Sequence, residues 1–330
     1  MVQTGHNVSV AFALNIAAGA ATILGGMVIL HKRLVYLANP VSLAVALSVS
    51  AGVMLFISFV EIFRESVHLL TLGLQTDDMN KSTATGHAWF AATCCFATGI
   101  ALIYVIDTIV HCISPDHEMT ELEHLQDVRE SMHRFESSKR GQSTSTPCLE
   151  TGGPPSYVQE DPSAQYYHMD ASAKRALQRM GVLSALAIGI HNLPEGIATY
   201  VGAIENSSVG VSLAVGIGLH NIPEGIAVAA PIYFATHSRW RGILWCAISA
   251  AAEPLGGVIA WVAIGNGMDP LSEGILFGIV CGIMICICVK ELIPTAFKFA
   301  QGQTHIIAYG MFAGMFVMVS SLTLFAYAGN

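Results

Sequence analysis

The chain contains one eight-residue stretch twice: residues 191–198 read HNLPEGIA and residues 220–227 read HNIPEGIA. Seven of the eight positions are identical, and the second copy follows the first at an offset of 29 residues. That offset is about the length of one long helix and a short turn, so we expect the copies on neighbouring helices that run in opposite directions. Histidine and glutamate stand at i and i+4 in each copy and therefore project from one face of a helix.

The composition around this repeat is that of a membrane protein. Of the 330 residues, 53% are hydrophobic and 12% are charged, whereas a typical soluble domain carries roughly 25% charged residues. Too few charged side chains are present to cover a surface in water. The formal charge of −8 leaves no basic domain to neutralise phosphates, so we expect no nucleic-acid partner.

Apolar runs of about 20 residues predict some eight transmembrane helices, and the expected fold class is an all-α membrane protein. A polar segment rich in Ser, Pro and Gly, residues 113–175, separates the third run from the fourth, and we expect it to be a largely disordered loop. The eight runs cover residues 7–30, 41–62, 88–112, 176–203, 209–234, 239–265, 271–292 and 305–328.

The distribution of basic residues predicts the orientation. Thirteen Lys and Arg residues fall on one side of the eight runs, and only Arg64 and Lys81 fall on the other. Lys and Arg are concentrated in cytoplasmic loops, so we expect residues 113–175 to face the cytoplasm and both termini to face away from it. The thirteen are Lys32, Arg33, Arg129, Arg134, Lys139, Arg140, Lys174, Arg175, Arg179, Arg239, Arg241, Lys290 and Lys298.

A second, weaker echo links the second and seventh runs. Gly52, Met54 and Glu61 match Gly282, Met284 and Glu291 at one offset of 230 residues. Repeats on antiparallel helices are typical of transporters built from inverted repeats, whose substrate site lies near the bilayer midplane. For only three matched residues, chance or ancestry without functional meaning stays open as the alternative.

The ionisable residues at membrane depth are acids and histidines without matching Lys or Arg. The fourth and fifth runs hold His191, Glu195, His220 and Glu224, and the sixth holds Glu253. Buried carboxylates must take up a proton, form a pair or hold a cation. The asparagine after each histidine adds an amide oxygen, and the proline before each glutamate frees a backbone carbonyl. This spacing favours a bound cation over hydrogen bonds that merely join the helices.

Nitrogen and oxygen ligands without thiolate suit divalent first-row metals, Zn²⁺ first and then Fe²⁺, Mn²⁺ or Co²⁺. The metal is therefore expected as a transported ion and not as a cofactor. The third run adds Asp107, for which a structural role and a role in metal exit are equally open.

With these motifs the chain resembles the ZIP family of divalent-metal transporters, in particular its bacterial-type branch. The resemblance rests on HNLPEG at 191–196, HNIPEG at 220–225, AEPLGG at 252–257 and the Gly-Val-Met stretch with a later Glu in the second run. It implies eight helices in a 3+2+3 inverted-repeat arrangement, with a metal site on helices 4 and 5. It implies as ligands His191, Asn192, Glu195, His220, Asn221 and Glu224, with contributions from Glu253 and Met54, and Glu61 at one mouth of the path.

The resemblance divides the chain into helices 1–3 (residues 1–112), a cytoplasmic loop (113–175), helices 4–5 with the metal site (176–234) and helices 6–8 (235–330). The leading hypothesis is a multi-pass importer of divalent metal, expected in the plasma membrane, with an organelle membrane left open. The alternatives are an intramembrane zinc-dependent hydrolase, disfavoured because H-E-x-x-H is absent, and a metal sensor that does not transport. Small-residue helix faces permit a homodimer.

Overall fold

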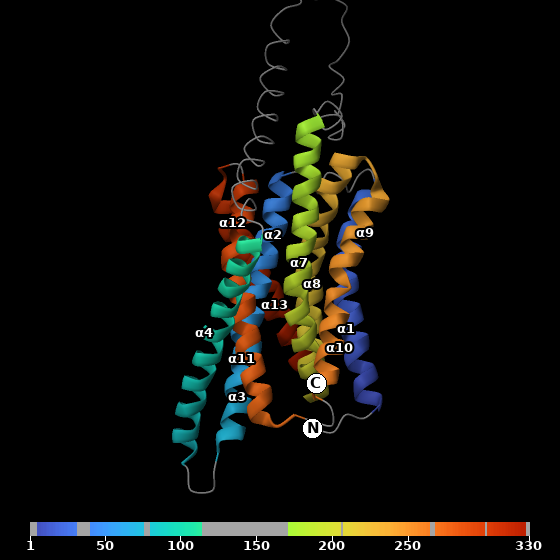
Figure 1. Ribbon diagram of the computed structural model, residues 1–330. Helices are drawn as coiled ribbons and strands as arrows, with labels where there is room; N and C mark the ends of the chain where they lie inside the picture. The colour runs from blue at the N-terminus through green and yellow to red at the C-terminus, as the bar shows by residue number, and fades with distance from the viewer. Residues whose placement is uncertain are drawn as a thin grey trace, which may run out of the picture.

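The computed structural model describes residues 5–31, 40–75, 80–113, 171–205, 207–264, 268–300 and 302–327. Every regular element within these ranges is a helix, and the helices form one elongated bundle (Figure 1). The expected all-α class is therefore confirmed. The expected loop at 113–175 lies outside the described residues except at its edges, where residue 113 ends one helix and residues 171–175 begin the next.

The helices form eight rods, several of them built from consecutive elements. In chain order the elements are α1 (Gly5–Gly26), η1 (Met27–Leu30), α2 (Pro40–Phe56), η3 (Ile57–Ile62), α3 (Phe63–Leu74), α4 (Lys81–Ile113), α7 (Ala171–Glu205), α8 (Ser207–Thr236), α9 (Arg239–Ala250), α10 (Ala252–Ile264), α11 (Pro270–Ile287), η4 (Cys288–Leu292), α12 (Ile293–Phe299) and α13 (Thr304–Tyr327).

Seven rods of the described chain are long and apolar enough to cross a membrane. The eighth is α7, which has 35 residues and is less apolar because it carries one copy of the polar motif and begins with basic residues. The eight rods agree with the number expected from the apolar runs. Residues 5–30 form the first of them, so α1 and α13 begin and end at the same end of the bundle.

The apolar runs predicted the existence of the rods better than their ends. The second rod was expected at 41–62 but continues as α3 to Leu74, and the seventh was expected at 271–292 but continues as α12 to Phe299. The third begins at Lys81, seven residues before the expected 88. A helix satisfies its own backbone hydrogen bonds, so it can extend beyond its apolar run into polar surroundings.

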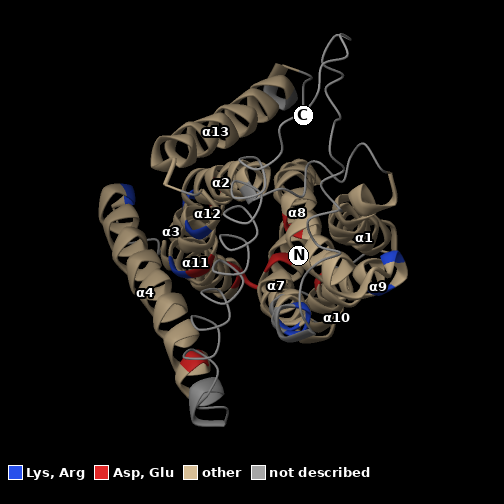
Figure 2. Ribbon diagram, turned by 90° about the horizontal axis from the view of Figure 1, so that it is seen from above, with Lys and Arg blue, Asp and Glu red and all other residues tan. Residues whose placement is uncertain are grey.

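The rods fall into two groups that meet along a seam (Figure 2). The first group contains α1, α7, α8, α9 and α10, and the second contains α2, α3, α4, α11, α12 and α13. Across the seam, α8 packs against α2, and α7 packs against α11. The two copies of the repeated motif therefore lie on the central pair of the first group, α7 and α8.

Glycine allows very close approach of the backbones within the first group. A Cβ atom at Gly25 of α1 would overlap the carbonyl oxygen of Ile222 in α8, and one at Gly256 of α10 would overlap that of Leu193 in α7. Small residues at helix contacts are the usual means of packing in membrane proteins. The motif helices are thus held by α1 on one side and by α10 on the other.

Two rods of the second group contain a π-helical turn. η3 holds Glu61 in the α2–α3 rod, and η4 holds Glu291 in the α11–α12 rod. These are the two glutamates that the 230-residue offset relates. Short π-helical turns are rare and are frequent at functional sites, so the weaker echo corresponds to a shared local structure.

Candidate functional site

The motif side chains meet between α7 and α8, deep within the bundle. Both helices continue through their motif prolines, Pro194 and Pro223. The four side chains His191, Glu195, His220 and Glu224 are all buried. Because α7 and α8 are antiparallel neighbours, the charged faces of the two copies point toward each other.

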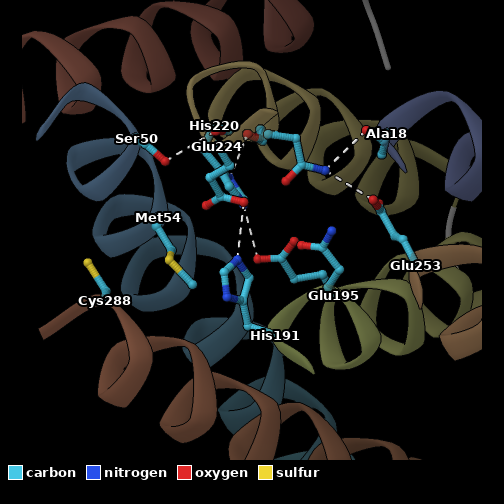
Figure 3. Close-up of polar contacts among 12 residues, drawn as sticks. Ala18, Ser50, Met54, His191, Glu195, His220, Glu224, Glu253 and Cys288 are labelled. Atoms are coloured by element: carbon cyan, nitrogen blue, oxygen red, sulfur yellow. Dashed lines mark hydrogen bonds and ion pairs between the residues drawn. The ribbon is translucent and has the colours of Figure 1, made fainter. Parts of the chain in front are cut away.

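The histidines and glutamates pair across the two helices (Figure 3). His191 Nε2 lies 3.1 Å from Glu224 Oε2, and His220 Nε2 lies 3.0 Å from Glu195 Oε1. Each imidazole thus faces the carboxylate of the other copy, although i and i+4 neighbours share a helix face. The four groups form two matched pairs around the contact of α7 with α8.

The second ring nitrogen of His220 is fixed by its own helix. Nδ1 lies 3.1 Å from the carbonyl oxygen of Gly216. A carbonyl only accepts hydrogen bonds, so Nδ1 carries a proton and donates it there. In the neutral imidazole Nε2 then keeps a lone pair, which is the arrangement that orients a histidine for a metal ion. Without a metal, the contact of Nε2 with Glu195 requires a proton shared by that pair.

The asparagines are turned so that their amide nitrogens face the neighbouring helices. Asn221 Nδ2 donates to the carbonyl oxygen of Ala18 at 3.1 Å and to Glu253 Oε2 at 3.0 Å. Asn192 Nδ2 donates to the carbonyl oxygen of Ser249 at 3.3 Å. Each amide oxygen is thereby left pointing away from those partners, so the site acquires two further acceptors.

Several buried acceptor atoms at the site have no hydrogen-bond partner among the described residues. Buried polar atoms are normally paired, and an unpaired carboxylate oxygen in an apolar interior is costly. All of these atoms can donate an electron pair to a cation, which would remove that cost. They are Asn192 Oδ1, Glu195 Oε2, Asn221 Oδ1, Glu224 Oε1, Glu253 Oε1 and His191 Nδ1.

The second group of helices contributes sulfur atoms and one hydroxyl on the facing side. Met54 is fully buried and lies beside Cys288 opposite His191 (Figure 3). The Cys288 thiol contacts the carbonyl oxygen of Ala51 at 3.6 Å. Ser50 Oγ donates to the carbonyl oxygen of His220 at 3.2 Å, so the two groups are joined directly at the site.

Two acids named from the sequence lie apart from these pairs. Glu61 lies in η3 and its carboxylate is 3.6 Å from Arg64. Asp107 of α4 forms an ion pair with Lys290 of η4, whose ammonium is also 5.5 Å from the centre of the Tyr104 ring. This pairing supports the structural role of Asp107, which joins the third and seventh rods.

One buried polar residue was missed in the sequence. Asn15 of α1 is fully buried, and its Oδ1 has no hydrogen-bond partner among the described residues. That oxygen would lie 3.0 Å from a Cβ atom at Gly196, and Glu253 Oε2 lies 3.2 Å from the corresponding position at Gly19, one turn along α1. Asn15 therefore stands beside the motif. The available signal was an asparagine within an otherwise apolar run.

The pairing leaves no group of three or more His, Cys, Asp or Glu side chains gathered as a metal cluster among the described residues. Two glutamates instead contact the opposite imidazoles, and the third, Glu253, contacts an amide. The arrangement is that of a site whose ligands hold one another while no ion is bound. Small side-chain rotations would be needed to turn the paired atoms toward a cation.

The fold and the site define a class of membrane transporter, and the sequence comparison identifies it. The profile of the ZIP zinc transporter family matches residues 8–321. The chain belongs to this family, which confirms the resemblance seen in the repeated motif. It is a multi-pass integral membrane protein, and its family is one of transporters and not of hydrolases.

The chain is most usefully compared with bacterial relatives of full length. It is 38% identical to the zinc transporter ZupT of Nitratidesulfovibrio vulgaris over 325 residues, which cover 98% of this chain and 100% of that protein. It is 34% identical to the zinc transporter ZupT of Clostridium perfringens, with 97% of both chains covered. The zinc transporter ZupT of Corynebacterium efficiens is 37% identical, with 97% of this chain and 98% of that protein covered.

Proposed function

We propose that this chain carries zinc across the membrane toward the cytoplasm, and that the ion binds between α7 and α8. The observation that carries the proposal is the set of two crossed His–Glu pairs surrounded by unpartnered buried acceptors. Family membership and the names of the relatives support zinc as the ion. Fe²⁺, Mn²⁺ and Co²⁺ are further candidate ions because the same ligand types accept them.

The proposed ligands are those named from the sequence: His191, Asn192, Glu195, His220, Asn221, Glu224 and Glu253, with Met54 facing them. A zinc ion that enters must lose water, and imidazole, amide and carboxylate groups replace it. The proton shared by His220 and Glu195 must leave when Nε2 binds the metal. Binding therefore exchanges protons for zinc, and lower pH disfavours it.

Movement of one helix group against the other would give the site access to each side in turn. The ligands of α7, α8 and α10 all belong to the first group, whereas Met54 and Ser50 belong to the second. Alternating access by such relative movement is common in transporters built from repeats. The ligand set would travel together, because its hydrogen bonds remain within the first group.

The proposed inverted repeat is supported by matched contacts. Asn221 donates to the carbonyl of Ala18, and Asn192 donates to the carbonyl of Ser249. The asparagines differ by the motif offset of 29 residues, and their acceptors relate α1 to α9 at an offset of 231. Gly25 with Ile222 and Gly256 with Leu193 repeat the same two offsets. We propose that α1, α2–α3 and α4 correspond to α9–α10, α11–α12 and α13.

Uptake of radioactive zinc into proteoliposomes tests the site. Glu195→Ala and Glu224→Ala should each reduce the initial rate at least tenfold, because each leaves an imidazole without its carboxylate and removes a ligand. Gly86→Ala is the matched control, since Gly86 lies on α4 with nothing within 4 Å of its added Cβ atom. Normal uptake in both glutamate variants would refute the assignment of the site.

The remaining expectations are proposals of the same kind. We propose helices 1–3 within residues 1–112, a cytoplasmic segment at 113–175, the site-bearing helices within 176–234 and helices 6–8 within 235–330. We also propose the plasma membrane as the location, a homodimer as the assembly, and Glu61 at the outer mouth of the path. Glu61 lies seven residues beyond Met54 along the second rod, or about 10 Å at 1.5 Å per residue.

A further inference from the structure

Three glutamates from three different rods converge at the end of the bundle opposite residues 114–170. Glu65 lies in α3, Glu205 is the last residue of α7, and Glu273 lies in the first turn of α11. None of them belongs to the repeated motif. The transport site described above does not use them.

The packing of the three rods places these carboxylates together. Ser66 Oγ donates to the carbonyl oxygen of Gly274 at 2.6 Å, which fixes the neighbours Glu65 and Glu273 at one level. Across the seam, a Cβ atom at Gly202 of α7 would lie 3.7 Å from the ring of Phe277 in α11. Both helices carry a glutamate about one turn farther outward from that contact, because they run in opposite directions.

The charges of Glu65 and Glu273 both act on Glu205, which confirms that the three groups are close. Glu205 belongs to the first helix group, whereas Glu65 and Glu273 belong to the second. The three carboxylates therefore bridge the seam between the groups. We call Glu65, Glu205 and Glu273 the outer acidic triad.

The triad is buried but lacks the partners that buried carboxylates need. Glu273 is 5% exposed and Glu65 is 7% exposed. Glu205 Oε2 is buried without a hydrogen bond, and no Lys, Arg or His side chain of the described ranges pairs with Glu205 or Glu273. Only Glu65 has a basic neighbour, Arg64, at 3.8 Å. Three such groups at one place would repel one another unless a cation joined them.

The triad also lies on the line that leads to the motif. Glu205 is ten residues beyond Glu195 on α7, and Glu65 is eleven residues beyond Met54 on the second rod. At 1.5 Å per residue both distances are about 15 Å. The triad thus stands at one level, about three helical turns outward from the paired imidazoles.

We propose that the outer acidic triad is a second divalent-cation site, at which the transported ion docks before it reaches the site between α7 and α8. Its ligands are carboxylate oxygens alone, which suit Mn²⁺ and Zn²⁺ and hold them with fewer constraints than imidazole does. The role in transport rests on the proposed function, but the binding of a cation to the triad does not. A concentrated negative charge at the mouth also raises the local concentration of divalent cations.

Direct binding is measured with Mn²⁺ alone on the purified full-length chain carrying Glu195→Ala and Glu224→Ala. Electron paramagnetic resonance should show bound Mn²⁺ in this background, and addition of Glu273→Gln or Glu205→Gln should abolish that signal. Asp269→Asn is the matched control: it removes a charge four residues from Glu273, and asparagine still caps α11. The site is refuted if no Mn²⁺ binds, or if binding survives both glutamine substitutions.

Zinc uptake into proteoliposomes separates a docking role from a structural one. In the otherwise unmodified chain, Glu205→Gln and Glu273→Gln should raise the half-saturating zinc concentration about fivefold to twentyfold and change the maximal rate less than twofold, as expected for lost electrostatic capture. The increase should shrink at high ionic strength, and Glu205→Asp should restore most of the affinity. A fall in maximal rate without a change in half-saturation would overturn the docking role.

These outcomes are independent of the central site. Normal uptake by Glu195→Ala and Glu224→Ala would defeat the proposed function even if the triad binds Mn²⁺. Unchanged half-saturation in Glu205→Gln and Glu273→Gln would defeat the docking role even if the central substitutions abolish uptake.

Discussion

At the scale of single residues, the site is shaped by which atom of each side chain is already engaged. Gly216 holds the Nδ1 proton of His220, and the carbonyls of Ala18 and Ser249 hold the amide nitrogens of the two asparagines. These contacts leave the lone pairs of nitrogen and oxygen for a cation. The side chains next to the ligands therefore decide the chemistry as much as the ligands do.

Asn15 should contribute to zinc affinity although it lies outside the repeated motif. Its amide oxygen is buried beside Gly196 without a partner, where it can accept from water bound to the ion. A hydrogen bond of this kind contributes about 0.5–1.5 kcal/mol, so Asn15→Ala should raise the half-saturating zinc concentration about threefold to tenfold.

Zinc-dependent uptake in proteoliposomes measures this effect. Ser9→Ala on the same helix is the control, because the exposed Ser9 hydroxyl bonds only to its own helix, at the carbonyl of Gly5. Equal half-saturation in Asn15→Ala and Ser9→Ala would mean that Asn15 serves packing alone.

At the scale of elements, glycine determines how closely the motif helices are enclosed. A Cβ atom at Gly225, directly after Glu224, would overlap the carbonyl oxygen of Thr22 in α1, and one at Gly196 would overlap that of Glu253 in α10. The backbone on the other side of each contact cannot move aside as a flexible side chain can. The position of the ligands is thus coupled to the separation of the helices.

Gly225→Ala should destabilise the folded protein by about 1–3 kcal/mol, the usual cost of overpacking. Thermal unfolding of the purified protein in detergent measures the loss. Gly86→Ala should leave the unfolding temperature unchanged or raise it slightly, because Gly86 is exposed on α4 and alanine favours a helix. An equal effect of both substitutions would show that steric overlap at Thr22 is unimportant.

The first turn of α11 shows how an element can be tied to its end. Asp269 caps α11, and its carboxylate accepts from the backbone nitrogen and the hydroxyl of Ser272. These hydrogen bonds lower the pKa of the exposed Asp269 carboxyl. The cap therefore stabilises α11 above the ordinary pKa of Asp and is lost as pH falls through the lowered value.

At the scale of the whole molecule, the bundle divides into two groups that share the load of transport. The first group carries the nitrogen and oxygen ligands, and the second offers a mainly apolar face with sulfur atoms and the ion pair of Asp107 with Lys290. The exposed outer surface is rich in large apolar side chains, such as Phe312, Phe316 and Leu324 of α13, as a lipid-facing surface requires. The seam between the groups is where acidic segments gather (Figure 2).

Orientation in the membrane gives a prediction for the complete protein. An epitope tag at the carboxyl end should bind antibody on intact right-side-out vesicles, whereas a tag inserted at residue 145 should bind only after permeabilisation. The reason is the split of thirteen basic residues to two across the rods. The opposite pattern of access would reverse the direction assigned to transport and place the outer acidic triad on the cytoplasmic side.

Local patterns in the sequence determined the all-α class, the eight rods, the family and the principal ligand types, because apolar run length and motif spacing are properties of short segments. The tertiary structure alone decided that each imidazole faces the carboxylate of the opposite copy, that Asp107 pairs with Lys290, and that Asn15 stands beside the motif. It also brought Glu65, Glu205 and Glu273 together from three rods. Such contacts join residues far apart in the chain, and they depend on how closely glycine lets the helices approach, which no short segment encodes.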